Sequence, residues 1–496
     1  MNQGISTTIK DLGPTKKKEL YFRVLHDCPM EQEKLSALFN GLKQAQYQVG
    51  AYSYTNRIKQ LKQLKTALAH TYRSRIHQAL QDDFGKPSTE VDLTELYPVI
   101  GEIDQACHHL KKWMSPTRVH TPISIWGSIS YYIQEPKGVC LIMSPWNYPV
   151  NLVFSPLVSA LAAGNTVMVK PSEHSPKTSA LVAEIIESIW PENHVAVVQG
   201  GIEVASNLLE FPWNHIHFTG APSIGKIVMA AASKHLSSVT LELGGQSPLI
   251  IDQTADVADC AQKLAWSKWI NAGQTCIAPN HVWVHRSKYT ELIEALKGQI
   301  NAHYQNTTQR GDSYCQIVNQ KHFDRLSQAL NETVSGGGEI VLGGTTIAED
   351  RYIAPTVVVD SPQDSRLMNE EIFGPILPVL LFDDVQEVIE DLKTKEKPLA
   401  LYFFSKNKNN IDQVLKYTRA GSTCINHAVV QYANGHLPFG GSNNSGLGKS
   451  HGVFGFQEFS NQRSVVKTWN NGLLRLVFPP YTPLKQKLAQ WSIKWL

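Results

Sequence analysis

Five short apolar runs alternate with longer amphipathic segments in the first half of the chain. The runs have the length of strands and cover residues 138–143, 166–170, 195–199, 215–219 and 240–243. Between the second and third runs, residues 178–190 carry five aliphatic side chains on one helical face and follow the start signal Ser175-Pro176. This alternation predicts an α/β fold built on a doubly wound parallel sheet.

The same patterns divide the rest of the chain into further units. Residues 34–121 have mostly helical periodicity and join 138–244 in a first domain, and residues 245–444 repeat the α/β texture in a second. An Ile-, Ser- and Tyr-rich stretch, 123–134, is centred on Gly127 and predicts an isolated β-hairpin. Because an isolated hairpin needs a partner, we expect another subunit to supply it.

We therefore assign residues 122–137 and 453–475 to a small β oligomerisation element, and we expect a homodimer. Residues 1–33 are expected to be a poorly ordered extension. Three consecutive lysines, 16–18, stand where the apolar core of a secretory signal would be.

The tail, 476–496, combines a Pro-rich turn with a short helix. Four apolar side chains of this helix share one face: Leu484, Leu488, Trp491 and Trp495. The helix falls short of the roughly 20 residues needed to cross a bilayer. We expect it to pack against the neighbouring subunit in the first instance, and to make peripheral lipid contact as the second choice.

One uncharged stretch, 150–169, does have the length of a membrane span. Pro156, Gly164 and Asn165 interrupt it, so a buried helix followed by a buried strand is the preferred interpretation, and no transmembrane segment is predicted.

The formal net charge of +3 over 496 residues gives no reason to expect a nucleic-acid partner. The seven cysteines are odd in number and lack CxxC spacing, which indicates a reducing, cytoplasmic location and no metal site.

A glycine-rich turn follows the fourth apolar run. Gly220 to Lys226 has the spacing of a P-loop, but Ile227 stands where a magnesium-binding Ser or Thr would be, so ATP hydrolysis is not supported. A strand, Gly220 and a helix beginning near Ser223 could still bind a pyrophosphate at the helix N-terminus. Such a glycine more often serves turn geometry alone.

Two residues are candidates for chemistry on local grounds. Cys276 lies in a polar, glycine-containing loop, 271–279, which suits an accessible thiol, although a cysteine is by default a buried apolar filler. Glu242 is an acid inside an apolar, strand-like run. Its placement indicates either an ion pair or a raised pKa suited to a general base, and local sequence leaves both open.

Seven motifs in a fixed order closely resemble those of the aldehyde dehydrogenase superfamily, from about residue 34 to the C-terminus. They are PWNYP from Pro145, KPSE from Lys170, FTG from Phe218, LELGG from Leu241, GQTC from Gly273, EEIFGP from Glu370 and LPFGG from Leu437. The Asn-Tyr-Pro form of the first motif, the Cys-Ile-Ala-Pro sequence at 276–279 and the FPPY tail at 478–481 are similar to the class-3 and fatty, or coniferyl, aldehyde dehydrogenase branch.

The resemblance implies NAD(P)-dependent oxidation of aldehydes to carboxylic acids, with medium or long aliphatic, or aromatic, substrates. Cys276 would attack the aldehyde to give a thiohemiacetal, and its oxyanion would be held by the Asn147 amide and the backbone N–H of Cys276. Glu242 would activate the water that hydrolyses the resulting thioester. A CoA-acylating enzyme and a non-catalytic small-molecule binder on the same fold are the alternatives; Glu242 argues against the first, and the intact trio of Cys276, Glu242 and Asn147 against the second.

The resemblance also implies that the first domain binds NAD, with NADP as a second accepted cofactor, and that 245–444 is the catalytic domain. The cofactor residues on this basis are Trp146, Lys170, Glu173, Gly220, Gly225, Glu371 and Phe373. Lys170 and Glu173 would bind the adenosine ribose and Glu371 the nicotinamide ribose. Ala221 stands where many relatives have Ser, so phosphate contact should depend more on backbone amides, and Gln246 replaces a commonly basic residue with no consequence evident from the sequence.

Overall fold

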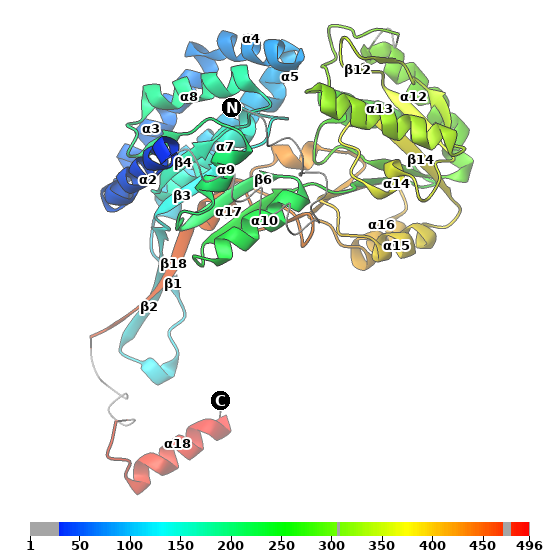
Figure 1. Cartoon of the computed structure of the whole chain (residues 1–496). Coiled ribbons are helices and arrows are strands. Elements are labelled where there is room, and N and C mark those ends of the chain that lie inside the picture. The colour runs from blue at the N-terminus through cyan, green and yellow to red at the C-terminus, as the bar shows by residue number, and fades with distance from the viewer. Residues whose placement is uncertain (1–28, 305–307, 470–477, 496) are drawn as a thin grey trace, which may run out of the picture.

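Two mainly parallel sheets, each with helices on both faces, organise the chain. The computed structural model describes residues 29–304, 308–469 and 478–495. Within them the two α/β units lie side by side, and a β arm extends from the first unit (Figure 1). The α/β, doubly wound class predicted from the sequence is confirmed.

The first sheet has six strands in the order β17-β7-β6-β3-β4-β5. They are β3 (Val139–Met143), β4 (Thr166–Lys170), β5 (Val195–Val197), β6 (His215–Gly220), β7 (Ser238–Leu243) and β17 (Gly446–Leu447). Each of the five apolar runs forms one of the parallel strands, and β17 adds an antiparallel edge from far along the chain. The order reverses beside β3, the first strand of the sheet in sequence, which creates a crevice at the carboxyl edge.

Alternate side chains of these strands face two separate apolar layers. Leu141 points toward a layer covered by α2 (Pro29–Gly50), α9 (Ile202–Leu208) and α10 (Pro222–Ser233). Ile142 points to the opposite layer, which is covered by α3 (Tyr54–Thr66), α4 (Arg73–Phe84), α6 (Tyr97–Trp113), α7 (Asn151–Ala163) and α8 (Pro176–Ile189). The period of two along each strand therefore builds both faces of the sandwich.

The uncharged stretch 150–169 forms the buried helix α7 and the buried strand β4, as expected. Gly164 ends α7 in the left-handed region, at φ 95°, and lets the chain turn directly into β4. No helix among the described residues is long and apolar enough to span a membrane.

The second sheet has seven strands in the order β10-β13-β14-β9-β8-β15-β16. They are β8 (Pro248–Ile251), β9 (His281–His285), β10 (Glu339–Leu342), β13 (Thr356–Val359), β14 (Ile376–Phe382), β15 (Ala400–Phe404) and β16 (Ser422–Ile425). The principal helices around it are α11 (Val257–Trp269), α12 (Tyr289–Tyr304), α13 (Gln320–Ser335), α15 (Val385–Thr394) and α16 (Lys408–Tyr417).

The arm differs from the expected hairpin at 123–134. Strand β2 (Ser128–Pro136) pairs along its whole length with β18 (Ser460–Thr468), and only its middle pairs with β1 (Thr117–Val119). Residues Ile123–Ile125 form a single 3₁₀ turn, so the expectation that they make the first strand is wrong. The strand that pairs with β2 on this edge is instead β1, which lies before the stretch 123–134, so the local pattern of that stretch does not record the pairing.

The structure also differs from the expected bounds of the second oligomerisation segment, 453–475, and of the N-terminal extension, 1–33. Residues 453–458 belong to helix α17 (Gly452–Glu458), which packs on α6 and α7, and the arm strand begins only at Ser460. Residues 470–475 lie outside the described residues, as do 1–28 of the expected N-terminal extension. Residues 29–33, assigned to that extension, are helical and begin α2.

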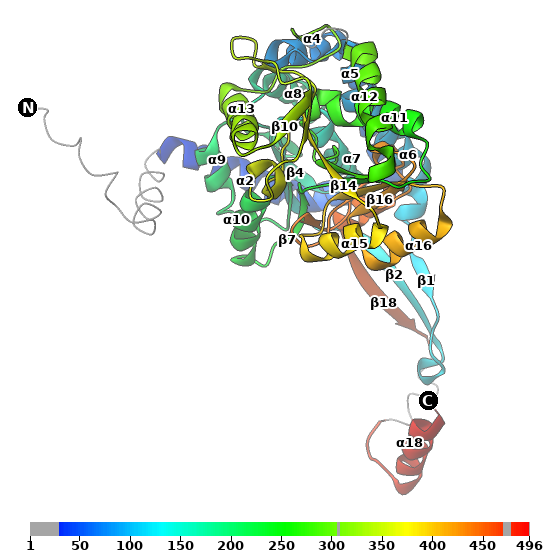
Figure 2. The same cartoon turned by 90° about the vertical axis from the view of Figure 1, so that its right-hand side faces the viewer.

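The C-terminal helix α18 (Pro483–Trp495) has 13 residues. In both views it lies apart from the two α/β units, beyond the distal end of the arm (Figures 1 and 2). Trp491 is 62% exposed and Leu484 66%. Among the described residues, Leu484, Leu488 and Trp491 of α18 are therefore not part of a core.

Candidate functional site

Four of the sequence-predicted residues lie at the carboxyl edge of the first sheet. Asn147 follows β3, Lys170 ends β4, Gly220 ends β6, and Glu242 lies in β7 opposite Thr219 of β6. Because parallel strands end at one edge, the topology brings together residues that are almost 100 positions apart in the sequence.

Cys276 reaches this edge from the second unit through a strained turn. After α11 the chain passes through Asn271, Ala272 and Gly273 in the left-handed region, at φ 55°, 50° and 72°. A Cβ at Gly273 would lie 2.3 Å from the carbonyl oxygen of Gly374, so only glycine fits there. Each non-glycine residue in this region costs roughly 1–2 kcal/mol, so surrounding contacts must hold the turn in place.

Two cavities border the thiol, and a third adjoins the inner one of these two. The first, about 220 Å³, is bordered by Trp146, Asn147, Gly220, Glu242, Gly244, Cys276, His322, Arg325, Glu371 and Phe373, among others. A smaller inner cavity of about 40 Å³ shares Cys276 and Glu242 with it, and continues past Glu102 and Tyr432 into an outer hollow of about 310 Å³. The Cys276 thiol and the Glu242 carboxylate thus lie at the junction of the groove and the inner cavity, and a ligand could reach them from either one.

The Glu242 carboxylate is buried and has no ion pair within the part of the chain that the structure describes. Its Oε1 accepts a hydrogen bond of 2.9 Å from the Ser450 hydroxyl, and its Oε2 has no hydrogen-bond partner. Burial raises the pKa of Glu242 to about 8, against smaller lowering effects of Ser450 and Lys449. The ion-pair interpretation left open by the sequence is wrong, and the perturbed carboxylate is suited to proton transfer near neutral pH.

The Cys276 side chain is partly exposed to the cavities, and its thiol is poorly solvated. Burial raises the pKa of the thiol to about 12, with the nearby carboxylates of Glu371 and Glu242 adding to the shift. The backbone N–H groups of Cys276 and Ile277 act in the opposite direction. The thiol is therefore protonated in this state, and it must lose its proton before the sulfur can attack a carbonyl carbon.

The Asn147 amide belongs to the same constellation. Its Nδ2 donates to the carbonyl oxygen of Gln274 at 3.0 Å, which leaves its second N–H for a ligand. Asn271 Nδ2 donates to the Asn147 carbonyl oxygen at 2.9 Å. The loop that carries Asn147 and the loop that carries Cys276 are thus bonded directly to each other.

Glu371 is half-buried and borders the groove, with Phe373 beside it. Its Oε1 has no partner among the described residues, burial raises its pKa to about 7, and a Cβ at Gly244 would collide with its Oε2 at 2.1 Å. Phe373 meets Trp146 edge to face at 5.5 Å. An unpaired carboxylate oxygen next to an aromatic wall fits a ligand that presents a hydroxyl group and a flat ring, as a nicotinamide ribose does.

Gln246 does have a structural consequence. Its Nε2 donates to the carbonyl oxygens of Met368 and Glu370, at 2.9 and 3.0 Å. It therefore anchors the segment that leads into Glu371. Sequence reasoning found no role for this residue because its partners lie more than 120 positions away.

Three predicted cofactor residues do not border the cavity around the thiol. Lys170 and Glu173 form an ion pair of 2.8 Å at the end of β4. Gly225 lies inside α10, where a Cβ would meet Leu243 at 2.7 Å, so it serves close packing of α10 on β7. The helix begins at Pro222, close to the expected start, and Ala221 offers no side-chain cap to its first N–H groups.

Sequence reasoning missed several groups around the site. His322 and Arg325 border the groove from α13, and His322 packs against Trp146 at 5.2 Å. Ser450 and His451 lie behind Glu242. The only sequence signal for His322 and Arg325 is that they are three residues apart, as neighbours on one helical face are. Such spacing is common on exposed helical faces and does not by itself indicate a site.

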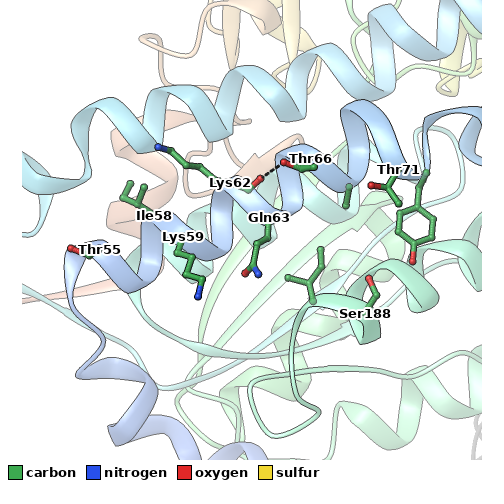
Figure 3. Close-up of a pocket in the computed structure, with 11 residues that line it drawn as sticks. Thr55, Ile58, Lys59, Lys62, Gln63, Thr66, Thr71 and Ser188 are labelled. Carbon is green, nitrogen blue, oxygen red and sulfur yellow. Dashed lines mark hydrogen bonds between the residues drawn. The ribbon is translucent and has the colours of Figure 1, made fainter.

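A much larger hollow, about 810 Å³, lies on the outer helical layer between α3 and α8. Figure 3 shows its polar rim, with Lys59, Lys62 and Gln63 from α3 and Ser188 from α8. Neither Cys276 nor Glu242 borders it, so size alone does not identify the site.

A doubly wound sheet with a groove at its carboxyl edge, bordered by a thiol and a perturbed carboxylate, is typical of a dinucleotide-dependent oxidoreductase. Residues 10–465 match the aldehyde dehydrogenase family. Aldehyde dehydrogenase family 3 member B3 of Mus musculus is 42% identical over 420 residues, 84% of this chain and 87% of that protein. The 4,4'-diaponeurosporen-aldehyde dehydrogenase of Staphylococcus aureus is 39% identical over 425 residues, 86% and 92% of the two chains.

A solved structure described as the substrate-bound state of Staphylococcus aureus AldH superposes with a TM-score of 0.87 at 37% identity, over 92% of this chain and 99% of that one. The chain belongs to the aldehyde dehydrogenase family and is an NAD(P)-dependent aldehyde dehydrogenase.

Proposed function

We propose that this enzyme oxidises an aldehyde to a carboxylic acid through a covalent intermediate on Cys276, with Glu242 as general base. The observation that carries the proposal is that Cys276 and Glu242 both border the cavity lined by Trp146, Glu371 and Phe373 and the inner cavity beyond it. Cofactor and aldehyde can then approach the same sulfur from opposite sides.

In the proposed reaction the Cys276 thiol releases its proton to solvent, and the thiolate sulfur attacks the aldehyde carbon to give a thiohemiacetal anion. The free N–H of the Asn147 amide and the backbone N–H of Cys276 stabilise the oxyanion. The bound nicotinamide cofactor supplies the hydride acceptor. Loss of hydride converts the thiohemiacetal into a thioester, and Glu242 draws a proton from a water molecule that hydrolyses it and frees the sulfur.

The residues present fit a dinucleotide. Glu371 offers an unpaired carboxylate oxygen, Phe373 and Trp146 offer aromatic walls, and the N-terminus of α10 follows Gly220. We propose NAD as the preferred cofactor, because the Glu173 carboxylate would accept hydrogen bonds from free ribose hydroxyls and repel a 2′-phosphate. The bonded Lys170 offsets part of this repulsion, so NADP is the second cofactor.

The walls of the inner cavity support the proposed substrate class. Leu152, Tyr432, Phe439 and Phe459 supply apolar and aromatic surface there, which supports medium or long aliphatic, or aromatic, aldehydes. A panel of aldehydes of increasing chain length, each assayed for NADH and NADPH formation, tests this. Product analysis with and without CoA separates hydrolysis from acyl transfer to CoA; CoA-dependent product would overturn the role of Glu242.

The arm and the tail support a proposed homodimer. Val119, Ile123, Trp126 and Val466 expose apolar side chains along the arm, and α18 lies near its distal end. Sedimentation should give twice the chain mass.

A cytoplasmic location is proposed because the described cysteines are all free. Peripheral lipid contact is the second proposed role of α18, after packing against the neighbouring subunit.

A further inference from the structure

A buried charged cluster lies behind the site and has no place in the proposed reaction. It consists of Lys86, Glu90 and Glu95, and we refer to it as the Lys86 cluster. Lys86 Nζ lies 3.1 Å from Glu95 Oε1 and 4.0 Å from Glu90 Oε1, and the side chains of Lys86 and Glu95 are fully buried. Burying ions is costly even when they are paired, so such a cluster needs an explanation beyond packing.

One side of the cluster reaches the Asn147 loop. Glu95 Oε2 accepts the backbone N–H groups of Val150 and Asn151, at 3.1 and 2.9 Å, at the start of α7. Helix α7 has no side-chain cap and no acidic residue of its own in its first turn. Glu95 therefore supplies the capping acceptor from another helical segment, and it fixes the end of the loop that carries Asn147.

The other side of the cluster reaches the Cys276 loop. Glu90 Oε1 accepts the backbone N–H of Asn271 at 3.0 Å, at the first of the left-handed residues that precede Cys276. Burial raises the pKa of Glu90 to about 7, and Lys86 opposes this shift. The carboxylate thus holds a backbone conformation that costs energy by itself.

Tyr148 closes the connection between the two loops. Its hydroxyl lies 2.6 Å from Thr275 Oγ1, and Lys86 Nζ lies 4.0 Å from the centre of its ring. A cation at that distance over an aromatic face is attracted to it. One buried ammonium therefore contacts the two carboxylates that bind the loops and the ring that bridges the loops.

We propose that the Lys86 cluster is a positioning device that holds the Asn147 amide and the Cys276 thiol at the separation that oxyanion stabilisation requires. This inference rests on the proposed function. None of the three cluster residues borders the cavities around the thiol, so they act through the two loops and do not touch substrate. Displacing such loops by about 1 Å can cost on the order of 100-fold in rate.

Glu90 is the residue to change, because its side chain is 13% exposed and the other two are fully buried. Glu90→Ala should lower kcat about 100-fold and leave the dissociation constant for NAD unchanged. Glu90→Gln keeps an oxygen acceptor for the Asn271 N–H and should retain most of the turnover. Asp92→Ala is the matched control: Asp92 lies two residues further on, pairs with Arg73 and His77, and should leave kcat unchanged.

Amide hydrogen exchange supplies a readout independent of turnover. In Glu90→Ala, exchange should become faster in both 147–151 and 271–276, and in Asp92→Ala in neither. The proposal is overturned if Glu90→Ala turns over like the wild type, or if only the Asn271 amide gains exchange. Should Glu90→Ala fail to fold, Glu90→Asp withdraws the carboxylate by one methylene but keeps the charge, and wild-type kcat in that variant likewise overturns the proposal.

The two levels of inference can fail separately. If the wild-type protein forms no NADH with any aldehyde of the panel, the proposed function fails. The exchange comparison then still decides whether Glu90 couples the two loops.

Discussion

Replacing Glu242 by Gln separates the two halves of the proposed reaction. The substitution is nearly isosteric and keeps an oxygen to accept the Ser450 hydroxyl, so the site should remain assembled. What it removes is the carboxylate that draws a proton from water. Hydride transfer should then still occur once, and the enzyme should stall as the thioester.

The expected loss of turnover in Glu242→Gln follows from the role of a general base. Positioned bases contribute roughly 10² to 10⁴ in rate, so steady-state kcat should fall by that factor. A rapid-mixing experiment should show a burst of about one NADH per active site before slow turnover. In the wild type, hydrolysis should accelerate as pH rises through about 8, where Glu242 loses its proton, and the variant should lack this rise.

The same carboxyl links stability to pH. Its pKa in the folded state, about 8, lies above the ordinary value of 4.5, so between these pH values the folded protein binds more protons than the unfolded chain. The free energy of unfolding therefore falls as pH rises through this window. One pKa unit corresponds to about 1.4 kcal/mol. Above pH 8 the free energy of unfolding of Glu242→Gln should therefore exceed that of the wild type by on the order of a few kcal/mol.

Absence of the burst, together with slowed hydride transfer, would refute the assignment of Glu242 as the base for hydrolysis. Equal thermal stability of the two proteins at alkaline pH would refute the argument from burial. Ser450→Ala is a useful comparison, because it removes the neighbouring hydroxyl and leaves the carboxylate in place.

Further predictions address the other parts of the site and the tail. Cys276→Ala should abolish turnover but leave NAD binding measurable by fluorescence titration; retained turnover would exclude the covalent mechanism. Gln246→Ala should raise KM for NAD more than it lowers kcat, since it frees the segment before Glu371, and an unchanged KM would contradict this. Glu173→Gln should improve kcat/KM with NADP relative to NAD, whereas a wild-type preference for NADP would show that Glu173 and Lys170 are misplaced. Deleting residues 484–496 should leave a soluble protein with altered chain-length preference, and a full-length protein that needs detergent for extraction would contradict the cytoplasmic proposal.

The sequence by itself determined the class of fold and the main candidates for chemistry. The five apolar runs and the period of two within them are local properties, and each run forms a strand of the first sheet. Cys276 and Glu242 stood out because a polar glycine loop and an acid within an apolar run are unusual in their immediate neighbourhood. Their motifs also placed the chain in its family.

Tertiary structure alone decided what surrounds those residues. Strand β2 pairs with β18, more than 300 positions away, on one edge and with β1 on the other, so the first strand of the hairpin lies at 117–119 and not within 123–134. Ser450 bonds Glu242 across 208 positions, and Glu90 holds Asn271 across 181. These contacts depend on which strand ends and helix starts meet at one edge of the sheet, and a pattern read over a few neighbouring residues carries no information about that meeting.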